Sequence, residues 1–392
     1  MRSMRITVLL LVAVLLASCA RAGDSIAPAG AATRHVRQAT VSYAPLYSFR
    51  NSPDGRYPDA GLVAVSGILY GTTSLGGADS EGTVFSLTKT DKESVVYSFK
   101  SSGDGESPFA GLLAVGSELY GTTADGGRGE YEGTVFKIGV NGGERVLYSF
   151  TGSSGANPYA GLIKLDNDFY GTASAGGSNH NGTVFLVSKN GRERTIHSFG
   201  GGDGATPNAS LTAVKGILYG TTQYGGSSGE GTIFAVSPSG TESDLHDFGE
   251  GSDGAVPRNA GLVAIDGAFY GTTCAGGTHG NGTVFLLAKS GSKYTERVLY
   301  NFGDTPEDGN CPSAGLTVHG GALYGTAYQG SSYGEGAIFK VTILGKESVL
   351  YSFKGKPDGA NPMGTLLAVG DTLYGTTSQG GNGFGTVFRI TP

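Results

Sequence analysis

The sequence predicts an all-β protein, a seven-bladed β-propeller made of four-stranded blades, and three observations support this fold class. One set of motifs recurs seven times at a spacing of about 50 residues. Each repeat contains four short segments rich in Val, Thr, Tyr and Phe, which favour strands. No segment after residue 20 has the apolar period of an amphipathic helix. Stacked repeats of this length share one core, so the 392 residues need not form several domains.

Three motifs define the repeat. The first is Leu/Phe-Tyr-Gly-Thr, the second is Gly-(Thr/Ala)-(Val/Ile)-Phe, and the third is mostly Leu-Tyr-Ser-Phe. The Tyr of the first motif lies at Tyr70, Tyr120, Tyr170, Tyr219, Tyr270, Tyr324 and Tyr374. We expect the recurring Tyr and Phe columns to pack between neighbouring blades, because positions that repeat in every unit are those that adjacent sheets need.

One repeat, residues 60–99, shows how the strands follow one another. We expect strands at 60–65, 69–73, 83–87 and 95–99, separated by Ser66-Gly67, by a loop that contains Gly76-Gly77, and by a polar turn. The two longer connections, between strands two and three and between strand four and the next blade, lie on the same face of such a meander. A ligand site on the loops would therefore be on that face.

The ends of the repeat region predict closure of the ring. It begins with a lone fourth strand at 41–49 and ends after a third strand at 386–390, so the N-terminal strand can complete the seventh blade. Closure removes exposed sheet edges. The alternative is an open β-solenoid, which would show degenerate capping repeats, whereas the last repeat here matches the middle ones.

The order of features resembles kelch blades, but the kelch Trp is missing, since the chain has no Trp. The three motifs more closely resemble the GloVer tandem repeat of bacterial exported proteins, over residues 41–392. This resemblance implies export and repetition, and it implies no established activity.

The N-terminal segment predicts export and a lipid anchor. Arg2 and Arg5 precede an apolar run at 6–15, which is too short to span a membrane and is typical of a signal peptide. Leu16-Ala17-Ser18-Cys19 resembles the lipobox of bacterial lipoproteins. The resemblance implies that residues 1–18 are removed and that Cys19 is acylated. An ordinary secretory signal with a chance cysteine is the alternative.

Residues 19–40 then read as the lipidated Cys followed by a flexible tether rich in Ala and Gly, and residues 41–392 as the propeller. The resemblance to envelope lipoproteins that lack Asp after the lipidated Cys implies the outer membrane, where the cell has one, because Ala20 follows Cys19.

The two remaining cysteines, Cys274 and Cys311, are expected to form a disulfide. An exported body lies in an oxidising compartment. The repeat register places Cys274 at the end of strand two of blade five and Cys311 in the loop that leads into blade six, on one face. Two unrelated free thiols are the alternative.

The residue before the second motif varies between repeats, and a binding surface needs such asymmetry. Four acids and two amides at this position could line a polar funnel, and the alternative is a set of solvated loop ends. These candidate ligand-binding residues are Glu81, Glu132, Asn181, Glu230, Asn281 and Glu335.

Asp-Gly recurs in the loops between blades, and we interpret it as a turn in which Asp bonds its own backbone, rather than as a ring of cation ligands.

His197 and His246 replace the Tyr of the third motif, and we interpret them as core residues. No calcium loop, zinc motif or nucleophile elbow appears, so we expect no metal, no cofactor and no identifiable catalytic residue.

The charge of the chain limits the kinds of partner that the sequence favours. A net charge of −6 without a basic run disfavours a nucleic-acid partner. We expect a monomeric binding or scaffolding propeller on the cell envelope, with a glycan or a protein as its ligand. A propeller lyase or glycosidase that uses funnel carboxylates is the second hypothesis, and a structural subunit of an outer-membrane assembly is the third.

Overall fold

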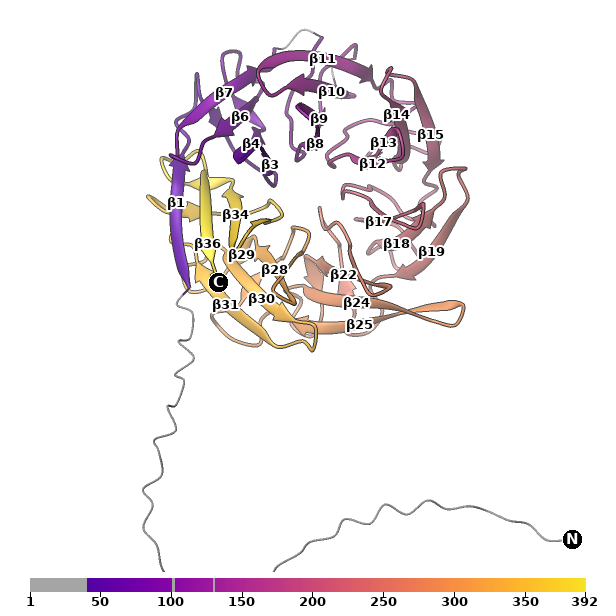
Figure 1. Cartoon of the computed structure of the whole chain (residues 1–392). Helices are drawn as coiled ribbons and strands as arrows, with labels where there is room; N and C mark the ends of the chain where they lie inside the picture. The colour runs from indigo at the N-terminus through magenta and orange to yellow at the C-terminus, as the bar shows by residue number, and fades with distance from the viewer. Residues whose placement is uncertain (1–40, 101–102, 130) are drawn as a thin grey trace, which may run out of the picture. The chain divides into compact units, whose positions relative to one another are not determined.

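The computed structural model describes residues 41–392, apart from residues 101–102 and 130. Seven four-stranded antiparallel sheets form a ring, which confirms the seven-bladed propeller (Figure 1). The signal peptide, the lipidated Cys19 and the tether expected in residues 1–40 lie outside the described residues.

Each blade runs from a short inner strand to a longer outer strand. The first three blades are β3 (Val63–Val65), β4 (Ile68–Thr73), β6 (Thr83–Leu87), β7 (Glu93–Ser98); β8 (Leu113–Val115), β9 (Glu118–Thr123), β10 (Thr134–Gly139), β11 (Gly142–Ser149); and β12 (Ile163–Leu165), β13 (Asp168–Ala173), β14 (Thr183–Ser188), β15 (Glu193–Ser198).

The next three blades have the same order. They are β16 (Thr212–Val214), β17 (Ile217–Thr222), β18 (Thr232–Val236), β19 (Glu242–Asp247); β21 (Val263–Ile265), β22 (Ala268–Thr273), β24 (Thr283–Ser290), β25 (Lys293–Asn301); and β27 (Thr317–His319), β28 (Ala322–Ala327), β30 (Ala337–Thr342), β31 (Glu347–Ser352).

The seventh blade joins the two ends of the described chain. It contains β33 (Leu367–Val369), β34 (Thr372–Thr377) and β36 (Thr386–Thr391), and its outer strand is β1 (Ser42–Ser48). β1 pairs antiparallel with β36, with Tyr43 opposite Ile390 (Figure 1). Both strands thereby gain a hydrogen-bonded neighbour, so the ring closes as the sequence predicts.

The core lies between adjacent blades. Seven hydrophobic clusters each draw their buried residues from two neighbouring blades, including one between blades seven and one. In every interface the Phe that directly follows a fourth strand packs edge-to-face on the Phe of the next blade's third strand, as Phe99 does on Phe136. Phe49 on Phe85 closes the series. The expected role of the Phe columns is confirmed.

The glycine of the Tyr-Gly-Thr motif is required by this packing. A Cβ added to Gly71 would lie 2.6 Å from the ring of Phe85 and 2.9 Å from Leu62. The equivalent glycines in the other six blades meet the same aromatic ring at 2.4–2.6 Å. Only a residue without a side chain fits under the ring.

The threonine after this glycine links one blade to the next. Thr72 Oγ1 donates to the main-chain oxygen of Ala110, at 2.9 Å, and Thr376 Oγ1 donates in the same way to Ala60 across the closure, at 2.7 Å. Six of the seven interfaces contain this bond. In these six interfaces it fixes the end of the interblade loop.

Two local features differ from the sequence-based expectation. The inner strand of blade one begins at Val63 rather than at residue 60, and Ala60 and Leu62 are buried in the loop before the strand starts. Short two-stranded ladders also join several Asp-Gly turns to the loop between strands two and three of the blade that follows the turn. They are β2 (Gly55–Arg56) with β5 (Leu75–Gly76), β20 (Gly254–Ala255) with β23 (Ala275–Gly276), β26 (Gly309–Asn310) with β29 (Gln329–Gly330), and β32 (Gly359–Ala360) with β35 (Gln379–Gly380).

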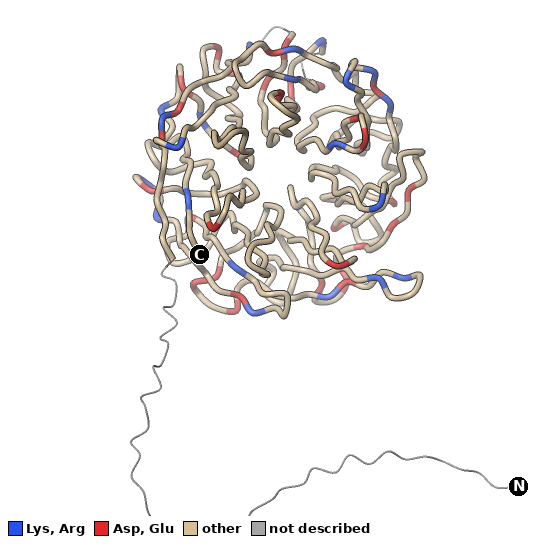
Figure 2. The backbone as a smooth tube through the Cα atoms, in the orientation of Figure 1, with Lys and Arg blue, Asp and Glu red and all other residues tan. Residues whose placement is uncertain are grey.

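Charged positions of both signs are interspersed along the ring, and many lie on its outer strands and loops (Figure 2). Among the described residues, none forms a helix that is long and apolar enough to cross a membrane.

Candidate functional site

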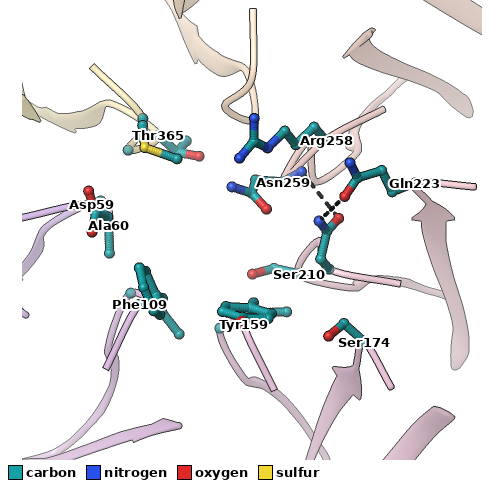
Figure 3. A pocket seen from close by; sticks show the side chains of 18 of the residues that line it. Asp59, Ala60, Phe109, Tyr159, Ser174, Ser210, Gln223, Arg258, Asn259 and Thr365 are labelled. Atoms are coloured by element: carbon teal, nitrogen blue, oxygen red, sulfur yellow. Dashed lines mark hydrogen bonds between the residues drawn. The ribbon is translucent and has the colours of Figure 1, made fainter. Parts of the chain in front are cut away.

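A cavity of about 430 Å³ lies at the propeller axis, where six interblade loops end. The residues between the Pro of each loop and its inner strand form most of the wall (Figure 3). The size is within the range of small-ligand sites. Six side chains in this wall occupy the same position of the repeat: Asp59, Phe109, Tyr159, Asn208, Asn259 and Met363.

This position was not singled out by the sequence analysis. It lies between Pro and Ala or Gly in a loop whose other residues recur, so the changing residue is a visible signal. We interpreted the column before the second motif instead, because variation alone does not show which loop end faces the axis. The inward approach of residues 59–61 and their counterparts is decided by tertiary packing.

Asp59 is the only carboxyl group among the residues that line the cavity. Burial raises the pKa of Asp59 to about 7, and a hydrogen bond from Ser74 Oγ, at 2.7 Å, opposes that increase. At neutral pH this side chain can therefore donate or accept a hydrogen bond.

Phe109 and Tyr159 form an aromatic wall. Their rings lie 5.2 Å apart in an edge-to-face arrangement, and they lie side by side across from the polar wall (Figure 3). Tyr159 is 37% exposed, unlike the buried aromatic residues of the core. An exposed ring in a cavity offers an apolar surface on which a ligand can stack.

The opposite wall carries amides and a cation. The Asn208 side chain accepts from the main-chain N–H of Asn259 at 3.3 Å and donates to Gln223 Oε1 at 2.6 Å, so its orientation is fixed. Arg258 is an extra residue that only the fifth loop contains, and it lies near Asn259 at the cavity (Figure 3). The cavity thus combines an aromatic surface with convergent hydrogen-bonding groups.

The six residues proposed from the sequence as ligand contacts do not line this cavity. Their main-chain oxygens accept hydrogen bonds from the residue before Pro in the following interblade loop, at 2.8–3.0 Å. The residues are Glu81, Glu132, Asn181, Glu230, Asn281 and Glu335. These bonds give each of the six residues the same place in its own blade interface. A shared funnel of their side chains stays a prediction.

Cys274 and Cys311 form the expected disulfide, which spans 37 residues. Cys311 N–H donates to Asn281 O, and Cys274 N–H donates to the main-chain oxygen of Val256. The bridge therefore ties the loop before blade six to the residue that follows β22.

The Asp-Gly residues stabilise turns, as expected. Asp54 accepts from the Tyr47 hydroxyl at 2.8 Å and from the main-chain N–H of Arg50 and of Gly55. His197 and His246 take the place of Tyr and lie 2.8 Å from Asp203 and Asp253. These histidines are half-buried rather than core residues, because the imidazole reaches the turn as the phenol does elsewhere.

Comparisons with solved structures show the fold alone. A lectin from Burkholderia pseudomallei aligns with a TM-score of 0.59 at 10% identity, covering 86% of this chain and 97% of the lectin. A puromycin-hydrolysing peptidase from Mycobacterium tuberculosis gives 0.54 at 11% identity, covering 90% of this chain and 55% of the peptidase. PorZ, a surface component of the type-IX secretion system of Porphyromonas gingivalis, gives 0.52 at 12% identity, covering 89% and 48%.

The sequence comparisons are more specific. No curated protein matches the chain. A family model of the Gloeobacter/Verrucomicrobia repeat matches residues 29–234 and 213–392, which together include all seven blades. The chain therefore belongs to the Gloeobacter/Verrucomicrobia repeat family.

Proposed function

We propose that the chain is a binding module of the cell envelope whose axial cavity takes a glycan or a similar polyhydroxylated ligand. The observation that carries this proposal is the wall of the cavity, in which one repeat position holds Asp, Phe, Tyr, Asn or Met while its neighbours stay nearly constant. A purely structural position would be expected to repeat as the core columns do.

The chemistry of the wall fits a sugar. The rings of Phe109 and Tyr159 suit the apolar face of a pyranose, and Asp59, Asn259 and Gln223 offer donors and acceptors for its hydroxyl groups. The likeness to a lectin and to a peptidase shows that this fold supports different functions, so it does not select the ligand.

Binding is tested with the full-length protein on a glycan array, followed by calorimetry with any glycan retained. Tyr159→Ala should weaken binding by about tenfold because it removes half of the aromatic wall. Tyr131→Ala is the matched control, since Tyr131 is 72% exposed and does not line the cavity. Binding that Tyr159→Ala leaves unchanged, or no bound glycan at all, would contradict the proposal.

A glycosidase or lyase is the second candidate, and one observation favours it. A cavity carboxyl group with a pKa of about 7 suits general acid or base catalysis. The two-carboxylate mechanism needs a partner, and no second carboxyl lines this cavity. Incubation of a bound glycan with the protein and with Asp59→Asn separates the two, since only an enzyme would yield products that the variant does not form.

Anchoring and placement are part of the same proposal. Mass spectrometry of the mature N-terminus should find an acylated Cys19, and Cys19→Ser should release the protein from the envelope. Fractionation should find the intact protein in the outer membrane where the cell has one. A role as a structural subunit is tested by affinity isolation from the solubilised envelope, in which stoichiometric co-purification of other envelope proteins would support that alternative.

A further inference from the structure

A ring of polar clusters lies at the outer part of the blade interfaces, away from the axial cavity. At most interfaces the cluster joins the Asp of one Asp-Gly turn to a side chain of the preceding fourth strand and to a glutamate of the next blade; Ser154 replaces the Asp in one cluster, and Tyr43 replaces the glutamate in another. At the first interface, Tyr97 donates to Asp104, and Glu144 of the second blade lies beside both. Two of these clusters contain His in place of Tyr.

A β-bulge explains how one strand serves two clusters. Residues four apart in a regular strand point to the same face. In β19 the pairing with β18 shifts between Asp244 and His246, which inserts one extra residue. Glu242 therefore reaches the cluster between the third and fourth blades, and His246 reaches the cluster between the fourth and fifth blades. The same bulge recurs in the outer strand of every blade.

The two histidine clusters have the residues of a metal site. His197, Asp203 and Glu242 bring one ligand atom each within 4.8 Å of one another, and His246, Asp253 and Glu296 do the same at the next interface. The imidazole Nε2 lies 2.8 Å from the aspartate in both. Ligand atoms around a tetrahedral zinc lie about 3.3 Å apart, so small side-chain rotations suffice to surround an ion.

A second observation is an unpaired acceptor. Oε1 of Glu242 and Oε1 of Glu296 are buried and have no hydrogen-bond partner among the described residues. An unpaired buried oxygen is unfavourable, and a bound cation would satisfy it. The same oxygen is unpaired in Glu93, Glu144 and Glu347, so the imidazole is what distinguishes the two histidine clusters.

We propose that His197, Asp203 and Glu242, and separately His246, Asp253 and Glu296, each bind a divalent transition-metal ion such as Zn²⁺ between adjacent blades. Each ion is held by one imidazole and two carboxylates, with water completing the coordination. Because each set spans two blades, the ion cross-links the third blade to the fourth or the fourth to the fifth. The sequence shows no metal-binding motif at these positions, because the glutamate of each set comes from the next blade.

The tyrosine clusters show why the histidine matters. Their glutamates have a similarly buried, unpaired oxygen, as at Glu144 and Glu347. Burial and the neighbouring aspartate, however, raise the pKa of Tyr97 and Tyr300, so the phenols stay protonated and are poor ligands. A neutral imidazole is a preferred ligand of zinc. The five other interfaces therefore serve as internal controls.

The two sites should differ in affinity. Asp244 lies near His197 and is coupled to it electrostatically, which adds a third carboxylate beside the first site. The equivalent residue at the second site is Val298. This additional negative charge should make the first site the tighter one.

Calorimetry of the full-length protein with zinc chloride tests the proposal. The wild-type protein should bind two ions, and His197→Tyr and His246→Tyr should each remove one of them. Both substitutions restore the residue that the other repeats contain, so the variants are expected to fold. Circular dichroism of the double variant checks this.

A gain of function is the complementary experiment. Tyr97→His places an imidazole beside Asp104 and Glu144, and the variant should bind one additional ion. No binding by the wild-type protein, or binding that the double variant His197→Tyr/His246→Tyr retains in full, would overturn the proposal.

Discussion

The two ends of each interblade loop differ in how much they vary. At the rim end, six repeats have Asp-Gly and the third has Ser154-Gly155, and the side chain accepts a hydrogen bond from the fourth strand. At the axial end, a few residues later, the side chain between Pro and Ala or Gly changes from repeat to repeat. The rim end is constrained because it holds the blade together. The axial end can vary because its side chain faces a cavity.

The loop between blades five and six contains a rim end, an axial end and, between them, one cysteine of the disulfide. Asp308 lies at the rim, Cys311 in the middle, and Ser313 at the axial position. Substitutions along this one loop should therefore reveal where stability depends on it.

The largest effect should come from the disulfide. Cys274→Ser/Cys311→Ser should lower the free energy of unfolding by up to about 4 kcal/mol, because the bridge restricts a loop of 37 residues in the unfolded chain. Denaturant unfolding of the full-length protein measures the difference. An unchanged midpoint in the double variant would show that the bridge adds no stability.

The next largest loss of stability should come from a substitution at the rim end of this loop. Asp308→Ala should cost roughly 3 kcal/mol, because it removes the acceptor of bonds from the Tyr300 hydroxyl, Gly303 N–H and the Thr305 hydroxyl. Ser313→Ala is the control at the equivalent axial position of this loop, and it should not lower the free energy of unfolding, because the buried hydroxyl of Ser313 has no partner to lose. Comparable losses in both variants would remove the contrast between the two ends.

The glutamates of the polar clusters between blades should also make stability depend on pH. Burial, with nearby acidic side chains, raises the pKa of Glu93, Glu144, Glu242, Glu296 and Glu347 to about 7. A raised pKa in the folded state favours the protonated form, so this stability is present below about pH 4.5 and is lost as the pH rises to about 7. Unfolding midpoints measured in metal-free buffer should therefore fall between pH 5 and pH 8.

Glutamine substitutions locate that dependence. Glu93→Gln/Glu144→Gln/Glu347→Gln should flatten the profile, because an amide does not titrate. Asp59→Asn at the axis removes one titrating carboxyl group instead of three, so it should flatten the pH profile less. A wild-type midpoint that rises with pH across this window would refute the assignment.

The smallest effect should come from the residue before Pro, between the two ends. It has a positive φ in all seven loops, and Val256, at 55°, is β-branched. Val256→Asn should stabilise the protein by about 1 kcal/mol, since Asn tolerates this conformation and occupies it at Asn157 and Asn361. Thermal unfolding compares the two, with Asn157→Val expected to shift the midpoint in the opposite direction.

The sequence by itself determined the number of blades, the four strands in each, the closure by residues 41–49 and the partners in the disulfide. These follow from local strand propensity and from a fixed repeat, which sets the register of every blade at once. The interpretation of Asp-Gly as a turn was also correct, because its hydrogen bonds are made within a few residues of the chain.

Only the tertiary structure decided which side chains meet. The cavity unites residues from separate blades, such as Asp59, Tyr159 and Asn259, so no spacing along the chain reveals it. The polar clusters between the blades likewise depend on a β-bulge, which turns Glu242 toward the preceding blade and His246 toward the following blade. A repeat predicts the same environment for equivalent residues, but the direction of each side chain depends on how the loops and bulges pack around the axis.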